Sequence, residues 1–558
     1  MFLQKNNKKT RNIDFDEILM DVHNIPGYHR ESFEGVLENP IKKQVFIFLG
    51  FFFFLAGIIF FSRLGFLNIT KGEFFLKRAE TNYLREIVRE PERGTILDKD
   101  KNILTSNEIL ESNKEKKWVR VYPNEGFLHS IGFLTRKENK NLAKGASGLE
   151  LVYNDILKGI PDQLIEEVNA AGEIMGSGFT KRGKKGGNIL TSISSKLSLQ
   201  LLHSIARTAE SHGFTGGAAI ALNPKNGEVL AIISFPEFDP NILSKNLSQE
   251  ELSKFILDER KPFFNRAVSG LYPPGSIIKP AIAAAALAEG IIDSKKTILS
   301  ASPIVIQNPY FPDNSDIFPD WKQHGLVDMK KALAISSNIY FYTIGGGHKD
   351  QAGLGIWKIL KYLEKFGFNN LTGIDLPGEV QGSLPKPDEK IENRSWSLGD
   401  TYHISIGQGD IGVTPVSMAV YASMLSRNGV FYPPHLAKAI IGEHGETLEK
   451  FLYSQNKIDI PSEAFAVVRE GMRDAVKFGT AAGLSGYPLE IAAKTGTAEV
   501  GDTGRVHSWS IGFAPYEDPK IAWAIIMENG PIQNTIGATF VASEMFRWIV
   551  ENNFLQNL

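Results

Sequence analysis

Apolar runs from residue 191 onward predict strands at both ends of a large unit and helices between them. Two β-rich runs, GGAAIALN (216–223) and EVLAIISF (228–235), flank the turn sequence PKNG, which is typical of a hairpin. Two further strand-like runs, HSWSIGFAP (507–515) and KIAWAIIMEN (520–529), lie near the end of the chain. Stretches with helical period begin at about residue 276, cover 328–343 and 414–426, and end the chain as ATFVASEMFRWIVENNF. This order predicts an α+β fold in which helices cover an antiparallel sheet.

A separate apolar run stands near the start of the chain. Residues 45–61 read VFIFLGFFFFLAGIIFF, contain no charge or proline, and extend over about 26 Å as a helix. Continuation past Arg63 can reach the roughly 30 Å of a bilayer core. A long polar segment precedes the run and no small-residue cleavage site follows it, which favours an uncleaved anchor at 44–66 over a signal peptide or a buried soluble helix. Basic residues are nearly balanced on its two sides, so charge alone does not orient it.

The polar segments divide the rest of the chain. Residues 1–43 have mixed charge and predict a tail, whereas 67–190 are charged and irregular and include the Gly/Lys-rich KRGKKGGN, which predicts an exposed loop. The 558 residues suffice for a large core with smaller additions. We therefore predict a tail (1–43), an anchor (44–66), a non-catalytic domain (67–190) and a catalytic domain (191–558).

Composition excludes several classes of function. Lys and Arg total 61 against 63 Asp and Glu, so the chain lacks the basic field of a nucleic-acid-binding protein. Cysteine is absent, which excludes disulfides, thiol nucleophiles and cysteine-based metal sites. A hydrophobic content of 42% indicates a folded chain.

The stretch YPPGSIIKPAIAAAALAEG (272–290) places a serine and a lysine at the start of an apolar helix. The turn formers before Ser276 predict that the helix begins at this serine, and Lys279 returns to the same face three residues later. A serine at a helix start lies near free backbone N–H groups, which suits a nucleophile that generates an oxyanion. Lys279 can act as its base only when neutral, and an apolar surrounding lowers a lysine pKa. A helix-capping serine with a surface lysine explains this segment alone equally well.

The same serine–lysine spacing recurs twice without that context. SLPK (383–386) contains a proline, and SQNK (454–457) lies in a polar loop. Neither opens an apolar helix, so we do not expect either to be catalytic.

Two further short motifs follow in a specific order. ISSNIYFY contains Ser336 and Asn338 at a predicted helix turn, and IAAKTGTAE contains Lys494, Thr495, Gly496 and Thr497 where an apolar strand turns polar. Gly496 allows a ligand to approach the backbone closely. Each motif alone is common in caps and turns. Together, the order S-x-x-K, S-x-N, K-T-G is that of penicillin-binding proteins and class A β-lactamases.

The chain resembles class B penicillin-binding proteins, and among them the elongation-type penicillin-binding protein 2 group. The resemblance rests on YPPGSIIKP, on ISIGQGDIGVTPVSMA (404–419), and on the sheet segments GAAIALNPKNGEVLAIISFPEFDPN and HSWSIGFAP. Upstream, EPERGTILDKDKNIL (90–104) and GASGLELVYNDILKG (145–159) are similar to the group's membrane-proximal pedestal. Only 17 residues separate Leu104 from Tyr122, where the group carries a larger head-like insertion, so the pedestal is shortened.

The resemblance implies a role for each motif residue in a peptidoglycan D,D-transpeptidase. Ser276 is acylated by the penultimate D-alanine of a stem peptide, Lys279 takes its proton, and Ser336 relays a proton to the leaving D-alanine. Asn338 holds a substrate amide, and the backbone N–H groups of Ser276 and Thr497 form the oxyanion hole. The residues expected to bind the terminal carboxylate, or its β-lactam mimic, are Lys494, Thr495, Gly496 and Thr497.

The resemblance also implies partners and a location. Stem peptides and β-lactams are the expected ligands, and a SEDS-type glycosyltransferase with other membrane proteins of the elongation complex are the expected partners. The chemistry places the catalytic domain outside the cytoplasmic membrane on a single anchor. No cofactor and no nucleic acid are implied. Some relatives hold a metal near the second motif through Asp, His and Cys; Asp313, Asp320 and His324 occupy the similar region, but without a Cys we expect no metal.

Three other functions compete with this interpretation. A β-lactamase or D,D-carboxypeptidase passes the acyl group to water, and the E-x-x-N motif of a class A enzyme is absent between Asn338 and Lys494. A β-lactam sensor typically has several membrane spans, and the sequence shows one. An idle scaffold of the elongation machinery is expected to have lost part of the motif set, which is complete here.

Overall fold

The computed structural model describes residues 43–76, 84–112, 115–135, 142–168, 174–244, 249–307, 315–389, 395–442, 444–501 and 503–557. The chain divides into two compact units. The first comprises residues 1–85 and 166–176, and the second comprises 86–165 and 177–558. The catalytic motifs all belong to the second unit.

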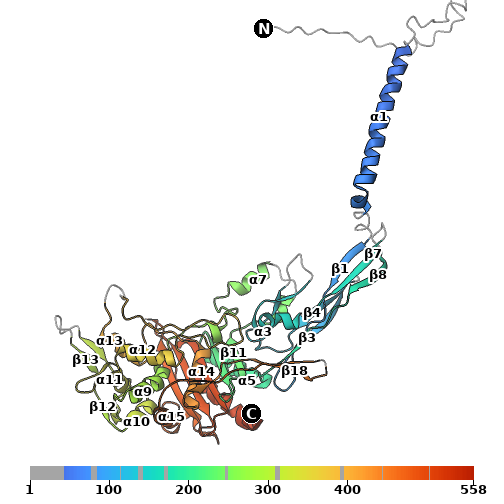
Figure 1. Cartoon of the computed structure of the whole chain (residues 1–558). Helices are drawn as coiled ribbons and strands as arrows, with labels where there is room; N and C mark the ends of the chain where they lie inside the picture. The colour runs from blue at the N-terminus through green and yellow to red at the C-terminus, as the bar shows by residue number, and fades with distance from the viewer. Residues whose placement is uncertain are drawn as a thin grey trace, which may run out of the picture. The chain divides into compact units, whose positions relative to one another are not determined.

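One long helix, α1 (Lys43–Thr70), dominates the first unit (Figure 1). Its apolar side chains occur all round the helix and none of its residues is buried. Its 28 residues extend over about 42 Å, and it is long and apolar enough to cross a membrane. The predicted anchor at 44–66 lies within α1, which is longer than expected at both ends.

A five-stranded antiparallel sheet in the order β11-β10-β22-β21-β20 forms the centre of the second unit. The predicted hairpin is confirmed as β10 and β11, and the two C-terminal runs as β21 and β22. The turn between β10 and β11 closes when Gly227, at φ 84°, donates its N–H to the Asn223 carbonyl at 2.8 Å. The bounds of the strands are β10 (Gly216–Leu222), β11 (Val229–Phe235), β20 (Ala492–Glu499), β21 (Arg505–Ala514) and β22 (Ile521–Pro531).

Helices cover both faces of this sheet, which explains why its strands read as continuous apolar runs. Alternate residues of β10 belong to two different hydrophobic clusters: Ala218 and Ile220 face one layer of helices, and Ala219 and Ala221 face the other. The helix layer next to Ala219 contains α5 (Ser195–His212) and α16 (Ala538–Glu551). The layer next to Ile220 contains α9 (Lys279–Ala288), α11 (Asn338–Gly346), α12 (Ile356–Lys365) and α14 (Pro415–Ser426) (Figure 1). The predicted α+β fold is confirmed.

The predicted helix region at 328–343 is two helices. The first is α10 (Met329–Ile335), which ends at Ser336 because this residue adopts the left-handed conformation at φ 59°. Ser337 then caps α11 by accepting a hydrogen bond from the Tyr340 N–H at 3.3 Å. The break places Ser336 at a sharp corner between the two helices.

The other helices and strands of the described residues are as follows. The helices are α3 (Gly148–Val152), α4 (Asn154–Leu157), α6 (Pro240–Ser244), α7 (Gln249–Ile256), α8 (Arg266–Ser269), α13 (Leu398–Ser405), α15 (Ser462–Lys477), and the 3-10 turns η4 (Gly275–Ile278), η6 (Ala482–Leu484) and η7 (Phe554–Asn557). The strands are β1 (Leu84–Arg89), β2 (Ile96–Leu97), β3 (Ile103–Ser112), β4 (Glu115–Val121), β5 (Leu134–Thr135), β6 (Lys144–Gly145), β7 (Asp162–Val168), β8 (Ile174–Lys181), β9 (Asn188–Thr191), β12 (Ile298–Ser300), β13 (Ile304–Ile306), β14 (Asp316–Phe318), β15 (Gly325–Val327), β16 (Val430–Phe431), β17 (Ala437–Ile441), β18 (Thr447–Lys450) and β19 (Asn456–Lys457).

The region that the sequence predicts as charged and irregular contributes β2, β3, β4 and most of β9 to a six-stranded sheet in the order β18-β17-β9-β2-β3-β4. Its strand β9 pairs with β17, so segments far apart in the sequence share one sheet. The Gly/Lys-rich loop between β8 and β9 is glycine-rich because other backbone lies against it. A Cβ on Gly186 would come within 1.9 Å of the Leu157 carbonyl oxygen. The glycines of this loop therefore permit close packing.

A buried ion cluster stabilises this region. Glu150 is fully buried and accepts hydrogen bonds from Arg93 Nε and from Arg120 Nε, both at 2.7 Å. The two guanidinium groups also bind Asn154 and Asn107, so the cluster links several segments between residues 93 and 154. Taking one partner out of a buried ionic cluster is costly because the remaining charges have no compensation.

We expect Glu150→Gln to lower the free energy of unfolding by about 3–5 kcal/mol, because two buried guanidinium groups lose their counter-charge. Asp155→Asn is the matched control, since Asp155 pairs with Lys158 in solvent, with its side chain 87% exposed. Chemical denaturation of the full-length protein in detergent measures both variants. Equal stability of the two variants would contradict a structural role for the cluster.

Candidate functional site

Ser276 lies in the 3-10 turn η4, directly before α9. We call residues 273–278, which contain the predicted nucleophile, the nucleophile turn. The N–H of Lys279 donates to the Ser276 carbonyl, and this i to i+3 bond stacks the lysine over the serine. Gly275 adopts φ 56°, and a Cβ there would lie 2.5 Å from the carbonyl oxygen of Thr497. The nucleophile turn and β20 therefore touch through their backbones, which places the Ser276 and Thr497 main chains close together.

Lys279, the first residue of α9, is fully buried, and its Nζ lies 5.4 Å from the centre of the Phe341 ring. Its Nζ donates to the Ser336 carbonyl at 2.9 Å, to Asn338 Oδ1 at 2.7 Å and to Ser336 Oγ at 3.2 Å. Burial lowers the pKa of Lys279 to about 7, and the opposing effect of the Asp320 charge does not overcome it. A substantial fraction of Lys279 is therefore neutral near neutral pH.

Lys494, on β20, contacts the Ser336 hydroxyl that Lys279 also contacts. Its Nζ donates to Ser336 Oγ at 2.9 Å and to the Thr495 carbonyl at 2.9 Å, and the residue is fully buried. Burial lowers the pKa of Lys494, and the nearby Lys279 lowers it further. Two buried ammonium groups repel one another across one serine, so the pair favours a state in which one lysine is neutral.

Ser336 joins the two lysines. A hydroxyl has two acceptor lone pairs and one donor hydrogen. Because both lysines donate to its oxygen, the hydrogen of Ser336 remains available to a ligand. A non-glycine residue at φ 59° is conformationally costly, and such conformations concentrate at functional sites.

Strand β20 is the edge of the central sheet and packs on the nucleophile turn. A Cβ on Gly496 would lie 2.9 Å from Ile277 Cγ2 and 3.0 Å from the Pro274 carbonyl oxygen. Glycine at this position is therefore required by packing against the turn, a reason that the sequence does not reveal. Thr497 is exposed, whereas the Thr495 hydroxyl bonds to the Thr480 hydroxyl at 2.7 Å.

Asp320 holds the Ser336–Asn338 corner in place, a role that the sequence does not indicate. Its carboxylate accepts from Ser337 Oγ at 2.7 Å, from the N–H groups of Asn338 and Ile339 at 2.9 and 3.2 Å, and from Ser300 Oγ at 2.8 Å. Burial opposes ionisation, but these hydrogen bonds together lower the pKa of Asp320. The carboxylate thus satisfies free N–H groups at the start of α11 from outside the helix.

The metal ligands considered from the sequence are only partly described. Asp313 lies outside the described residues. His324 Nε2 is 3.6 Å from Asp320 Oδ1. Within the described ranges, no group of three or more His, Asp or Glu side chains could hold a metal ion.

Gly407 supports the nucleophile turn from a third direction. Its carbonyl accepts a hydrogen bond from the Gly275 N–H at 2.9 Å, and a Cβ on Gly407 would lie 2.1 Å from the Gly275 carbonyl oxygen. Trp509 Nε1 donates to the Pro273 carbonyl at 3.1 Å. The sequence indicates the contact between Gly407 and Gly275 only through the glycine-rich segment ISIGQGDIG. It does not show which backbone these glycines approach.

The structure brings all eight predicted residues together. Hydrogen bonds link Ser276, Lys279, Ser336, Asn338, Lys494 and Thr495, and the backbones of Gly496 and Thr497 closely approach the nucleophile turn. The competing SLPK segment is outside any helix, with Ser383 exposed, and the SQNK segment is exposed.

Asp320→Asn is expected to destabilise the corner, because an amide replaces one acceptor oxygen with an NH2 group that faces other donors. We expect a loss of about 1–3 kcal/mol in the free energy of unfolding and faster hydrogen exchange at the Asn338 and Ile339 amides. Asp316→Asn, at an exposed position of β14, is the control. Unchanged exchange at the two amides would contradict this role of Asp320.

Comparison with known proteins identifies two domains. A profile for the penicillin binding protein transpeptidase domain matches residues 217–551, and a profile for the penicillin-binding protein dimerisation domain matches residues 112–191. The chain is 32% identical over 447 residues to peptidoglycan D,D-transpeptidase MrdA of Acinetobacter baumannii. This match covers 75% of the chain and 64% of that relative, so the chain spans just under two thirds of its length.

Solved structures show the same fold. The structure of Pseudomonas aeruginosa PBP2 in complex with WCK 5153 has a TM-score of 0.68 and 27% identity, covering 84% of this chain and 98% of that one. The complex of PBP2 and MreC from Helicobacter pylori has a TM-score of 0.69 and 23% identity, covering 84% of this chain and 100% of that one. From the two domain matches, the relatives and the geometry of the three motifs, the chain belongs to the class B penicillin-binding proteins, in the elongation-type penicillin-binding protein 2 group.

Proposed function

We propose that this protein is a membrane-anchored serine D,D-transpeptidase that cross-links peptidoglycan stem peptides during cell-wall elongation and binds β-lactams covalently. The observation that supports this most strongly is the buried Lys279, whose pKa is lowered to about 7 and whose Nζ bonds to Ser336 and Asn338 one turn after Ser276. A lysine with this pKa is suited to general-base catalysis near neutral pH.

In the acylation step, Ser276 Oγ attacks the carbonyl carbon of the penultimate D-alanine while neutral Lys279 takes the hydroxyl proton. The oxyanion that forms is bound by the backbone N–H groups of Ser276 and Thr497, a contribution of about 3–4 kcal/mol per donor. The close approach of Gly275 to the Thr497 carbonyl supports this assignment, because it places the two backbones side by side.

Collapse of the tetrahedral intermediate breaks the bond to the terminal D-alanine. Ser336 gives its available hydroxyl hydrogen to the leaving amine and recovers a proton from Lys279, whose Nζ lies 3.2 Å away. Lys279 is neutral again at the end of the step. The geometry of Ser336 between two lysines suits this relay.

The carboxylate of the substrate compensates the positive charge of Lys494. The terminal carboxylate binds near Lys494, with the help of Thr495, Gly496 and Thr497 of β20. Its negative charge favours the protonated form of Lys494, and the Lys494 charge in turn favours the neutral form of Lys279. Asn338 accepts from Lys279 through Oδ1, and its amide nitrogen is the group that holds a substrate amide.

An amine of a second stem peptide then attacks the acyl-enzyme, which gives the cross-link. Transfer to water, as in a carboxypeptidase or β-lactamase, is the alternative. The absence of an E-x-x-N motif between Asn338 and Lys494 favours the amine.

The proposal also includes the membrane topology of the protein and its partner proteins. We propose a cytoplasmic tail at 1–43, an anchor at 44–66 in the inner membrane, a pedestal at 67–190 and an extracytoplasmic catalytic domain at 191–558. The apolar helix α1 supports the anchor. The H. pylori PBP2 structure in complex with MreC supports membrane proteins of the elongation complex as partners. A SEDS-type glycosyltransferase is the partner that would supply the polymer.

Ser276→Ala is expected to abolish covalent labelling of the full-length protein by fluorescent penicillin, because Ser276 Oγ is the atom that forms the acyl-enzyme in the proposed mechanism. Ser454→Ala, in the exposed SQNK segment, is the control and should label like the wild type. Gel fluorescence measures both. Labelling that persists in Ser276→Ala would refute the assignment, and rapid release of hydrolysed drug from the wild type would favour a β-lactamase.

The rate of penicillin acylation is expected to rise with pH and to level off above about 7. Lys279 has its pKa lowered to about 7, so its neutral, proton-accepting form becomes the major one above that value. Lys279→Arg should lose acylation at every pH, because arginine does not deprotonate. Lys457→Arg is the exposed control. Stopped-flow acylation between pH 5 and pH 9 tests this, and a midpoint near 10 would exclude Lys279 as the base.

A further inference from the structure

Trp509, on β21, is a fully buried residue of the central sheet that also contacts the nucleophile turn. Its Nε1 donates a hydrogen bond to the Pro273 carbonyl at 3.1 Å. The catalytic steps of the proposed function do not use this residue, and an indole N–H donates without being able to accept. Its position therefore suits a residue that holds the turn rather than one that reacts.

The nucleophile turn needs a hydrogen-bond donor from outside because it begins with two prolines. Pro273 and Pro274 have no backbone N–H, so neither can donate a hydrogen bond to a neighbouring strand. The carbonyl of Pro273 can only accept, and the indole of Trp509 supplies the hydrogen. Loss of the indole N–H would take this bond away from a partly buried carbonyl.

Gly496 gives the indole access to the turn. Trp509 and Gly496 are direct partners across β21 and β20, so their side-chain positions lie on the same face of the sheet. A Cβ on Gly496 would lie 3.2 Å from Trp509 Cβ and 3.0 Å from the Pro274 carbonyl oxygen. The tryptophan and the turn therefore meet over the one strand position that has no side chain.

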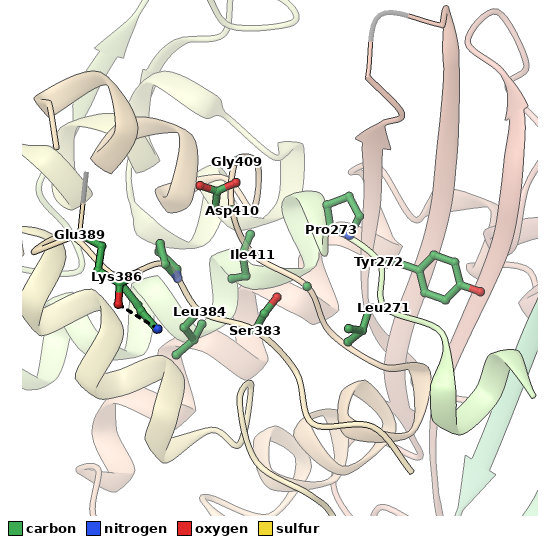
Figure 2. A pocket seen from close by; sticks show the side chains of 12 residues that line it. Leu271, Tyr272, Pro273, Ser383, Leu384, Lys386, Glu389, Gly409, Asp410 and Ile411 are labelled. Carbon is green, nitrogen blue, oxygen red and sulfur yellow. Dashed lines mark hydrogen bonds and ion pairs between the residues drawn. The ribbon is translucent and has the colours of Figure 1, made fainter. Parts of the chain in front are cut away.

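The residue before the turn contacts the same tryptophan. Tyr272 points toward the strands of the central sheet, which are drawn in faint red in Figure 2. Its ring meets those of Trp509 and His507 edge-on, at 6.1 and 5.1 Å between ring centres. Leu271 and Pro273 also border a pocket of about 580 Å³, so packing around this segment is incomplete on that side (Figure 2). The sheet side, where Trp509 lies, supplies the close contacts.

The Trp509–Pro273 bond lies near the two donors of the oxyanion hole. Pro273 is three residues before Ser276, whose N–H is one donor in the proposed function. Thr497, which provides the other N–H, directly follows Gly496 on β20. A shift of the turn relative to β20 changes the separation of these two N–H groups. An oxyanion hole stabilises the transition state only when its donors are placed to meet one oxygen.

We propose that Trp509 is a positioning residue, whose hydrogen bond to the Pro273 carbonyl sets the separation between the Ser276 and Thr497 N–H groups. The inference rests on the proposed function, which supplies the acylation of Ser276 and its oxyanion hole. Trp509 acts through the turn and takes no part in proton transfer. Removal of its N–H therefore slows the chemical step and leaves the binding of the ligand largely unchanged.

The test compares two tryptophans of the same sheet in the full-length protein in detergent. Trp523, on β22, is the matched control because it is also fully buried and also lies opposite a glycine, Gly512. Its Nε1 donates to Ser510 Oγ at 3.2 Å, and it belongs to the hydrophobic cluster on the other face of the sheet from the turn. Replacement of either tryptophan by phenylalanine keeps an aromatic ring and removes one buried N–H.

Stopped-flow acylation by penicillin measures the limiting rate and the half-saturating concentration separately. We expect Trp509→Phe to lower the limiting rate about tenfold, a part of the roughly 10²–10³-fold loss that follows removal of a whole oxyanion-hole donor. The half-saturating concentration should change by less than about twofold, because ground-state binding does not depend on the hole. Trp523→Phe should be acylated like the wild type, although both variants lose thermal stability.

Infrared spectroscopy of the penicilloyl enzyme measures the same geometry independently of the rate. Hydrogen bonds from an oxyanion hole polarise the ester carbonyl and lower its stretching frequency. The carbonyl band, identified with isotope-labelled penicillin, should therefore move to higher wavenumber in Trp509→Phe and keep its position in Trp523→Phe. A loss of stability alone does not move this band.

Three results would overturn the positioning role: an unchanged limiting rate in Trp509→Phe, a lower rate with an unmoved carbonyl band, or equal changes in Trp523→Phe. If Trp509→Phe does not fold, site-specific replacement of Trp509 by 3-benzothienylalanine decides by the same two measurements, since this residue keeps both rings and has sulfur in place of the N–H. Failure of the wild type to react with penicillin would instead overturn the proposed function.

Discussion

Burial of the Lys279 ammonium is the constraint on which the site depends. Its Nζ has left water, and the groups that replace water are the carbonyl and hydroxyl of Ser336 and the amide oxygen of Asn338. These acceptors are available only because the helix breaks at Ser336 and turns its carbonyl toward α9. Asp320 in turn holds that break. Thus one desolvated amine imposes the conformation of a corner more than fifty residues away in the chain.

Close backbone approach is the second constraint, and it explains the glycines of the motifs. The nucleophile turn is enclosed by β20 on one side and by Gly407 on another, at separations that leave no room for a Cβ. Such packing fixes the position of the Ser276 backbone, whose N–H points at the developing oxyanion in the proposed mechanism. The turn is rigid although Ser276 itself is only half-buried.

Apolar packing and a buried ion cluster both stabilise the second unit. The central sheet is buried on both faces by helices, and one of its two hydrophobic clusters extends to Ile96, Leu104 and Leu149. Leu149 is followed by Glu150, whose buried carboxylate is shared by two arginines, and β9 pairs with β17. Removing one member of the ion cluster would leave the other buried charges without compensation.

The sequence by itself determined the α+β class, the hairpin, the membrane-length helix and the residues of the three motifs, because these follow from periodicity and from short-range spacing. The apolar helix also suggested a lowered pKa for Lys279 through desolvation, and the structure places this lysine in a fully buried position. Only the tertiary structure placed Asp320 and Gly407 at the site, showed that one serine lies between two lysines, and revealed the strands of the pedestal. Those features depend on contacts between segments that are distant in the chain, and local pattern contains no information on which distant backbone or charge a residue will meet.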